Sequence, residues 1–333
     1  MKKKILNLTS LLFVIYCLIP LNLLSQENSD FKPSGNVILR TFFDYHTDFH
    51  DHRGFDITRA YIGYNYKFTP TLQAKVIVDG ASGKNSSNQL VPFLKNAYVN
   101  WNYKNWDVNA GLINSLINPT QEKYFGLRYV IENIATLNKI GQSADLGINA
   151  TYKFNKIVSV DASITNGEGY KDIEMNNTMR YALGTNIKPV KNLLIRGYVD
   201  YYNKPSDTVK INSKKDLITM NVFVGYDNSK LAVGAEYIQQ FNNKFIKEND
   251  FQGYSVFSSI KVAPKWKPFI RYDYMKSTSI NDKPWNKTDG SLAILGIEYQ
   301  PTKLLKFAAN FRNYNYIKKD AEQFIYLNAE FNL

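Results

Sequence analysis

All three histidines of the chain fall within ten residues, in the stretch DYHTDFHDHR at 44–53. Three aspartates alternate with them, and histidine beside carboxylate serves both in zinc ligation and in proton transfer. The candidate ligands are His46, His50 and His52, interleaved with Asp44, Asp48 and Asp51. The elements that flank this stretch decide whether it is a metal site, part of a catalytic centre or a solvated loop.

The flanking chain alternates apolar and polar residues with a period of two. In NVILRTFFDYH at 36–46, Val37, Leu39 and Phe43 share one face, while Arg40 and Asp44 share the other. This alternation predicts a strand with one apolar and one polar side. Each segment with this alternation is about nine or more residues long, which is enough for a tilted strand to cross a bilayer. Sixteen such segments occur, at 36–46, 54–68, 71–80, 92–103, 105–113, 144–154, 156–165, 178–188, 191–203, 216–226, 230–241, 252–262, 266–275, 290–300, 303–313 and 323–333.

The links between these segments alternate in length. Short links follow the even-numbered segments, as at 69–70 and 228–229, and long links follow the odd-numbered ones, as at 166–177 and 242–251. A transmembrane barrel has short periplasmic turns and long external loops. The sequence therefore predicts an all-β fold, an antiparallel up-and-down transmembrane barrel of about 16 strands.

The apolar rows fit a lipid-facing exterior. Aromatic residues gather toward their ends, where a membrane barrel has its girdles. An aromatic soluble core is the alternative, but it would not leave one face polar on nearly every strand. The charges on these rows are expected at strand ends, and they include Asp56, Lys95, Lys191 and Lys303.

The amino terminus has the pattern of a secretory signal. Three lysines precede the apolar run LLFVIYCLIPLNLL, which is too short and too interrupted by Pro20 to favour the alternative of an uncleaved anchor. We expect residues 1–25 to be removed after Sec-type export and residues 26–333 to form the barrel in the outer membrane of a Gram-negative bacterium. Cys17, the only cysteine, lies in the signal, so the mature chain would contain no disulfide.

The polar rows should face a water-filled lumen, since sixteen strands enclose more space than side chains fill. Guanidinium groups there would lower the barrier for carboxylates or phosphates, or they would pair with neighbours such as Asp200 and Asp273 and brace the wall. The predicted pore-lining cations are Arg40, Arg59, Lys75, Arg180, Arg196, Arg271 and Arg312.

The longest link, 114–143, follows the fifth strand and is rich in apolar residues. Such a segment is not expected to remain in solvent, so we predict a functional loop that folds into the barrel and narrows it. The alternative is a loop that packs on the rim or against a neighbouring subunit. Its candidate constriction cations are Lys123, Arg128 and Lys139.

Several blocks resemble, in order, the phosphate-selective porin O and P family. They are GFDITRAYIGYNYKFTPTLQAKVIVDG at 54–80, LKNAYVNWNY at 94–103, VNAGLINSLINP at 108–119, ADLGINATYKF at 144–154 and ASITNGEGY at 162–170. The resemblance implies a trimeric sixteen-stranded outer-membrane barrel that passes small anions by diffusion past an inserted loop. Arg59, in ITRAY, matches the family's basic position on the second strand.

The expected function is a passive porin for small hydrophilic solutes, with a preference for anions such as phosphate. The net charge of +12 suits anionic solutes or an anionic surface. The three histidines would then lie in the first external loop as solvated turn residues, with zinc or calcium capture as the alternative. No enzyme activity and no cofactor are predicted. The expected partners are the lipid bilayer with its lipopolysaccharide and two further copies of the chain, not nucleic acid. A barrel that acts mainly in adhesion through its loops is the alternative function.

Overall fold

The computed structural model describes residues 31–48, 50–84, 90–172, 177–205, 214–280, 283–284 and 289–333. The segment 1–25, predicted to be a signal, lies outside the described residues. Among the described residues, no helix is both long and apolar enough to cross a membrane.

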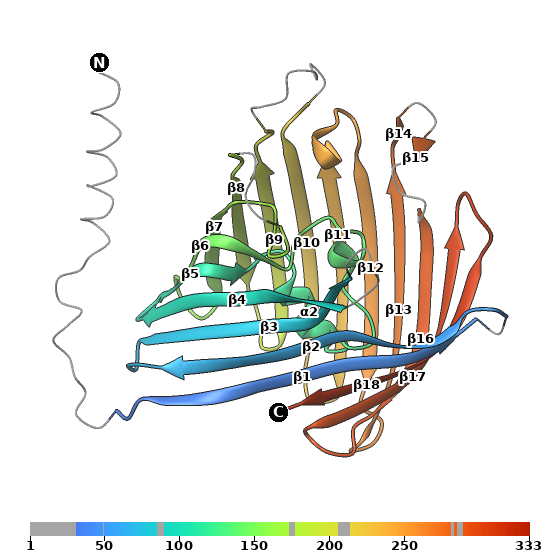
Figure 1. The fold of residues 1–333 in the computed structure, drawn as a ribbon, viewed down its shortest axis with the longest axis horizontal. Coiled ribbons are helices and arrows are strands. Elements are labelled where there is room, and N and C mark those ends of the chain that lie inside the picture. The colour runs from blue at the N-terminus through green and yellow to red at the C-terminus, as the bar shows by residue number, and fades with distance from the viewer. Residues whose placement is uncertain are drawn as a thin grey trace.

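Sixteen strands form one closed antiparallel barrel, in which the last strand, β18, pairs with the first, β1 (Figure 1). The predicted strand bounds agree within two residues except at the ends of β3 and β17, so the predicted fold class is confirmed. The short strands β14 (Ser279–Ile280) and β15 (Lys283–Pro284) form a separate hairpin between β13 and β16. The barrel strands are β1 (Ser34–Thr47), β2 (Arg53–Lys67), β3 (Leu72–Lys84), β4 (Leu90–Tyr103), β5 (Trp106–Asn114), β6 (Ala144–Lys153), β7 (Val158–Thr165), β8 (Arg180–Ile187), β9 (Leu193–Tyr202), β10 (Leu217–Asp227), β11 (Leu231–Phe241), β12 (Phe251–Ile260), β13 (Trp266–Ser277), β16 (Gly290–Tyr299), β17 (Leu305–Tyr316) and β18 (Glu322–Asn332).

One end of the barrel carries only tight links, and we call it the turn end. Asparagine shapes two of these turns: the side-chain oxygen of Asn155 accepts hydrogen bonds from the amides of Ile157 and Val158. Asn228 does the same for the amides of Lys230 and Leu231. In such an Asx turn the side chain replaces a backbone hydrogen bond, so the chain reverses within a few residues. The opposite end, the loop end, carries the longer links, including 115–143.

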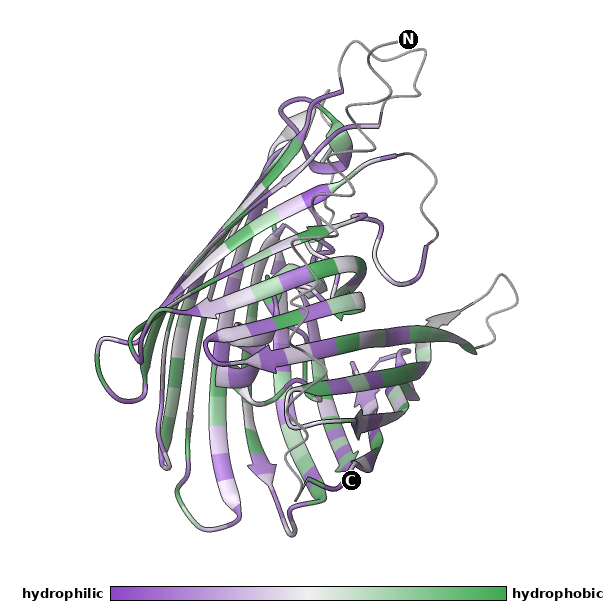
Figure 2. Cartoon of the chain, turned by 90° about the vertical axis from the view of Figure 1, so that its left-hand side faces the viewer, coloured by the Kyte–Doolittle hydropathy of each residue, from purple (hydrophilic) through white to green (hydrophobic). Residues whose placement is uncertain are grey.

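The two faces of each strand differ as the alternation predicts. On β9, Arg196, Tyr198 and Asp200 are buried toward the lumen, while Ile195 and Val199 are exposed on the outside. The hydropathy colours alternate along many strands in the same way (Figure 2). The barrel therefore presents apolar side chains outward and mostly polar side chains inward, except where inward apolar residues contact segment 115–143.

Two register shifts move charges that the sequence placed on the outside. The pairing of β1 with β2 shifts after Phe42, which brings Asp56 opposite Asp44 on the inner face. The pairing of β3 with β4 shifts at Ile77 and Val78, and Lys95 turns inward, with an exposed fraction of 8%. The predicted outward direction of Asp56 and Lys95 is therefore wrong, because an extra residue in one strand reverses the alternation beyond it.

The link between β5 and β6 contains two short helices, α2 (Pro119–Phe125) and α3 (Ile134–Leu137). Proline stands in the first turn of α2, and Gly126 ends this helix with a φ of 67° that favours glycine. Asn133 caps α3 by accepting a hydrogen bond of 2.8 Å from the amide of Thr136. A 3₁₀ turn, η1 (Asn243–Phe245), lies in the link between β11 and β12.

Candidate functional site

The segment 115–143 packs against inward-facing side chains of the barrel wall. Helix α2 lies inside the barrel (Figure 1) and contacts β10, β11 and β12. Helix α3 contacts β12. Burial of each large apolar side chain stabilises this arrangement by roughly 1.5–3 kcal/mol. The principal cluster joins Phe125, Leu127, Tyr129, Val130 and Ile131 of the segment to Phe42, Phe223, Phe257, Phe269, Leu292 and Ile294 of the wall.

Three wall arginines donate to backbone carbonyls of this segment. Arg196 reaches the carbonyl of Leu116 at 2.8 Å, Arg271 that of Glu132 at 2.7 Å, and Arg312 that of Val130 at 2.7 Å. Carbonyls in a non-repetitive segment need such donors when they are buried. These three predicted pore-lining residues therefore lie at the contact between the wall and the segment.

Two of these arginines are also ion-paired. Arg196 holds Asp161 through two contacts of 2.7 and 2.9 Å, and Arg271 holds Asp273 at 2.6 Å. The exposed fraction of both arginines is 2%. Of the two carboxylates considered as bracing partners, Asp273 pairs with Arg271, whereas Arg196 pairs with Asp161, which was not among them.

Hydrogen bonds from uncharged donors complete the attachment of the segment to the wall. The hydroxyl of Tyr129 donates to Glu298 at 3.0 Å. Gln121 donates to Glu236 at 3.1 Å, and the side chain of Gln240 donates to the carbonyl of Ile140 at 2.9 Å. Contacts to β11 and β16 thus supplement the arginine contacts, and the segment is bound along its length.

A network of charges joins the segment to β2, and we call it the Arg59–Arg128 cluster. The carboxylate of Glu132 accepts a hydrogen bond of 2.6 Å from Arg59 and one of 2.8 Å from Arg128. Arg128 also contacts Glu122 at 2.9 Å, and Arg59 lies 3.6 Å from Asp79. Burial alone would raise the pKa of Glu132, but Arg128 and Arg59 outweigh burial and hold this pKa below its usual value.

Two lysines that sequence reasoning missed lie beside this cluster. Lys95 donates to Ser143 and lies 4.4 Å from the ring centroid of Tyr170, within electrostatic range of Arg59 and Arg128. Lys171 also interacts with Arg59, and its ammonium lies over the ring of Tyr170. Lys95 was missed because the register shift hides its direction, and Lys171 because it belongs to an irregular link.

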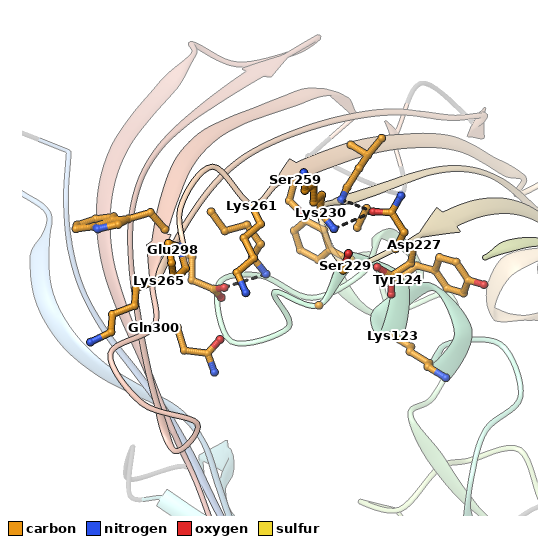
Figure 3. Close-up of a pocket in the computed structure, with 18 residues that line it drawn as sticks. Lys123, Tyr124, Asp227, Ser229, Lys230, Ser259, Lys261, Lys265, Glu298 and Gln300 are labelled. Atoms are coloured by element: carbon orange, nitrogen blue, oxygen red, sulfur yellow. Dashed lines mark hydrogen bonds and ion pairs between the residues drawn. The ribbon is translucent and has the colours of Figure 1, made fainter. Parts of the chain in front are cut away.

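A second group of cations lines a pocket of about 250 Å³ between α2 and the turn end (Figure 3). We call it the lysine pocket, and its cations are Lys123, Lys230, Lys261, Lys265 and Lys267. Among the residues that the structure describes, two acidic ones, Asp227 and Glu298, line it. Among the described residues, the one ion pair within it joins Lys267 to Glu298 at 2.9 Å. The pocket therefore carries an excess of positive charge.

The remaining predicted cations are dispersed. Arg40 pairs with Glu330 at 2.6 Å, and Arg180 lies 3.9 Å from Asp200. Lys75 is half-buried opposite Tyr98, and Lys139 is exposed just after α3. Of the predicted constriction residues, Arg128 joins Arg59 through Glu132, Lys123 belongs to the lysine pocket, and Lys139 contacts neither group.

The three histidines do not lie together. His46 belongs to β1 and faces the lumen, so its predicted place in the first external loop is wrong; its ring nitrogen lies 2.9 Å from Asp44. The backbone amides of His50 and His52 donate to Asp48, which forms a turn in the link. Donation by the His50 amide, opposed by slight desolvation, lowers the pKa of Asp48. Within the described part of the chain, no group of three or more potential metal ligands converges.

The closed antiparallel barrel is a fold shared with solved outer-membrane proteins. Solved structures with this fold include the outer-membrane channel DcaP of Acinetobacter baumannii, at 13% identity, 92% coverage of this chain, 99% of that chain and a TM-score of 0.65. OprB of Pseudomonas putida matches at 12% identity, 90% and 94% coverage and a TM-score of 0.67. OmpT of Vibrio cholerae, an outer membrane protein solved in a trimer form, matches at 15% identity, 91% and 100% coverage and a TM-score of 0.63. No protein-family model matches the sequence, and no curated protein is similar to it in sequence.

Proposed function

We propose that the protein is an outer-membrane diffusion porin that favours small anions, including phosphate and small carboxylates. The observation that carries the anion preference is the lysine pocket, where five ammonium groups face two carboxylates. A solute that crosses the barrel must pass the turn end, and fixed positive charge there raises the local concentration of anions and lowers their barrier.

The wider setting of the proposal is the outer membrane of a Gram-negative bacterium, reached by Sec-type export. The exposed apolar side chains on the outer face suit lipid, and the closed barrel leaves no unpaired strand edge in the bilayer. The proposed assembly is a homotrimer. The trimer form in which OmpT of Vibrio cholerae was solved supports this choice.

The proposed path narrows where segment 115–143 approaches β2. The Arg59–Arg128 cluster would form this constriction, because it joins a side chain of the segment to one of the opposite wall. Arg196, Arg271 and Arg312 would act as braces that hold the segment in place, since their donors are used by carboxylates, amides and carbonyls.

Planar-bilayer recordings in a KCl gradient test the proposal. The wild-type reversal potential should have the sign of an anion-preferring channel. Replacing Lys123, Lys230, Lys261 and Lys265 together with glutamine should reduce the anion-to-cation permeability ratio at least about fivefold, because one unit charge about 4 Å away contributes roughly 1 kcal/mol in water.

The matched control replaces Lys104 and Lys156 with glutamine. Both are exposed lysines in other links of the turn end, outside the lysine pocket. The control should keep the wild-type ratio. A cation-preferring wild type would refute the charge argument, and a folded protein that passes no current would refute the porin and favour a barrel that binds surfaces through its loops.

A further inference from the structure

A row of aromatic side chains lines the inner wall on β1, β17 and β18, between the packed segment and the loop end. Pairing fixes its direction: Phe324 lies opposite Arg312, whose guanidinium donates to the internal segment, and Tyr326 lies opposite His46. Tyr314 packs against the cluster that segment 115–143 forms with the wall. We call this row the aromatic strip, and its members are His46, Tyr314, Tyr316, Phe324 and Tyr326.

The rings of the strip follow one another without a gap. Tyr316 stacks on Tyr314 with centroids 5.9 Å apart, and Tyr314 meets Phe324 edge-on at 6.1 Å. Phe324 lies 6.0 Å from Tyr326, which stacks on His46 at 5.2 Å. These separations are those of favourable aromatic pairs. The result is a continuous aromatic track that leads along the wall from the loop end.

The strip differs from the buried aromatic core below it. Phe42, Phe223 and Phe257 of that core are buried, whereas all five strip side chains are only partly buried. A girdle that serves the membrane would point outward, as Tyr254 and Tyr272 do. The strip therefore exposes ring surface to the inside of the barrel. Lipid does not reach this surface, and the internal segment covers only part of it.

Hydrogen-bonding groups border the rings. Asp44 lies 2.9 Å from His46, and Glu322 accepts from the Tyr316 hydroxyl at 3.1 Å and from Lys319 at 2.8 Å. The guanidinium of Arg312 lies 3.5 Å from the Tyr326 ring centroid. It covers one face of that ring, and its donors are taken by Asn310 and by the carbonyl of Val130. The remaining ring surface of the strip, edged by carboxylate and hydroxyl groups, is complementary to a sugar ring, whose C–H face is apolar and whose rim carries hydroxyl groups.

We propose that the aromatic strip binds saccharides, stacking against one face of the sugar ring while the bordering polar groups bind its hydroxyls. This site would give the proposed porin a second class of solute. The inference rests on the proposed function only in one respect, that the strip lies on the path of a solute. The charges of the two carboxylates, Asp44 and Glu322, are offset by those of Arg312 and Lys319, so a neutral saccharide fits the strip better than an ionic one. The lysine pocket at the other end of the barrel has the opposite preference.

Titration calorimetry on the full mature chain in detergent micelles tests the site without requiring conduction. Maltotriose should bind, and sorbitol, an open-chain polyol with similar hydroxyl groups but no ring, should not. Replacing Tyr314, Phe324 or Tyr326 singly with leucine should weaken maltotriose binding about three- to tenfold, the range expected for loss of one aromatic contact. The matched control, Tyr254→Leu, alters an outward-facing aromatic side chain and should leave binding unchanged.

Each outcome has a defined meaning. Absence of maltotriose binding to the wild type, equal binding of sorbitol, or binding that the three strip variants leave unchanged would overturn the site. The wild-type comparison of maltotriose with sorbitol decides the matter even where a variant fails to fold. A protein that binds maltotriose but passes no current would refute the porin alone, and a conducting protein that binds no saccharide would refute the strip alone.

Discussion

Replacing Glu132 with glutamine should make the channel more selective for anions. The Glu132 carboxylate is shared by Arg59 and Arg128, at 2.6 and 2.8 Å. Glutamine keeps the size of the side chain and one oxygen acceptor but removes the negative charge. Arg271 and Arg312 still donate to backbone carbonyls of the segment, so its position should be preserved.

The magnitude follows from the charges of the cluster. The four cations Arg59, Lys95, Arg128 and Lys171 lie near the three carboxylates of Asp79, Glu122 and Glu132. Removal of one carboxylate raises the local excess of positive charge. A unit charge about 4 Å from a passing ion contributes roughly 1 kcal/mol in water and roughly 4 kcal/mol where the site is partly desolvated. The lower value already gives about a fivefold rise in anion permeability.

The assay is the reversal potential of single channels in a KCl gradient, with conductance recorded at the same time. Glu132→Asp, which keeps the charge, is the control and should stay near the wild-type ratio. A glutamine variant with unchanged conductance and an unchanged ratio would refute the placement of this cluster on the ion path. A large rise in conductance would show instead that the segment had moved.

Three further predictions concern stability, measured by urea unfolding in micelles. Because the pKa of Glu132 is lowered in the folded protein, its charged form stabilises the fold above the unfolded pKa of about 4.3; the difference between wild type and Glu132→Gln should stay constant from about pH 8 to 5 and shrink below about pH 4. Arg196→Met leaves the buried carboxylate of Asp161 unpaired and should lower the unfolding free energy by about 3–5 kcal/mol, and adding Asp161→Asn should recover much of this loss. Gly111→Ala should cost about 1–3 kcal/mol, since Gly111 has a φ of 123° and its added Cβ would lie 2.3 Å from a backbone oxygen, whereas Gly54→Ala, with open space around it, should change stability by less than about 0.5 kcal/mol.

The barrel could be predicted from sequence because each strand repeats the same two-residue period. On β9 the outward Ile195 and Val199 and the inward Arg196 and Asp200 obey this period from end to end. The exceptions are local. In the sequence, a bulge can be recognised only because the residues after it alternate in the opposite sense. Near Lys95 the neighbouring residues fit either sense of alternation. The direction of the Lys95 side chain is therefore fixed only by the pairing of β4 with β3.

The Arg59–Arg128 cluster and the lysine pocket could not be predicted from sequence, because each is formed by contacts between segments far apart in the chain. Arg59 and Arg128 were both predicted to face the lumen, but only the approach of segment 115–143 to β2 brings them to one carboxylate. The lysine pocket likewise combines residues of α2 with residues of two turns far along the chain. Lys230 and Lys261 lie in inward phase in the sequence, whereas Lys265 belongs to a tight link, where the period gives no direction.

Arginine and lysine take different places in this barrel for a physical reason. The guanidinium group has five donors in a rigid plane, so Arg196 can satisfy a carboxylate and a backbone carbonyl at once, and burial then stabilises a fixed contact. The ammonium group of lysine is more strongly hydrated and sits on a flexible stem, which suits Lys261 and Lys265, both exposed at the turn end. Arginines near the strand middles therefore hold segment 115–143, and the mobile positive charge that attracts anions is expected at the lysine pocket. On this reasoning, Lys261→Gln should shift selectivity without lowering stability, whereas Arg196→Met should lower stability and leave selectivity unchanged.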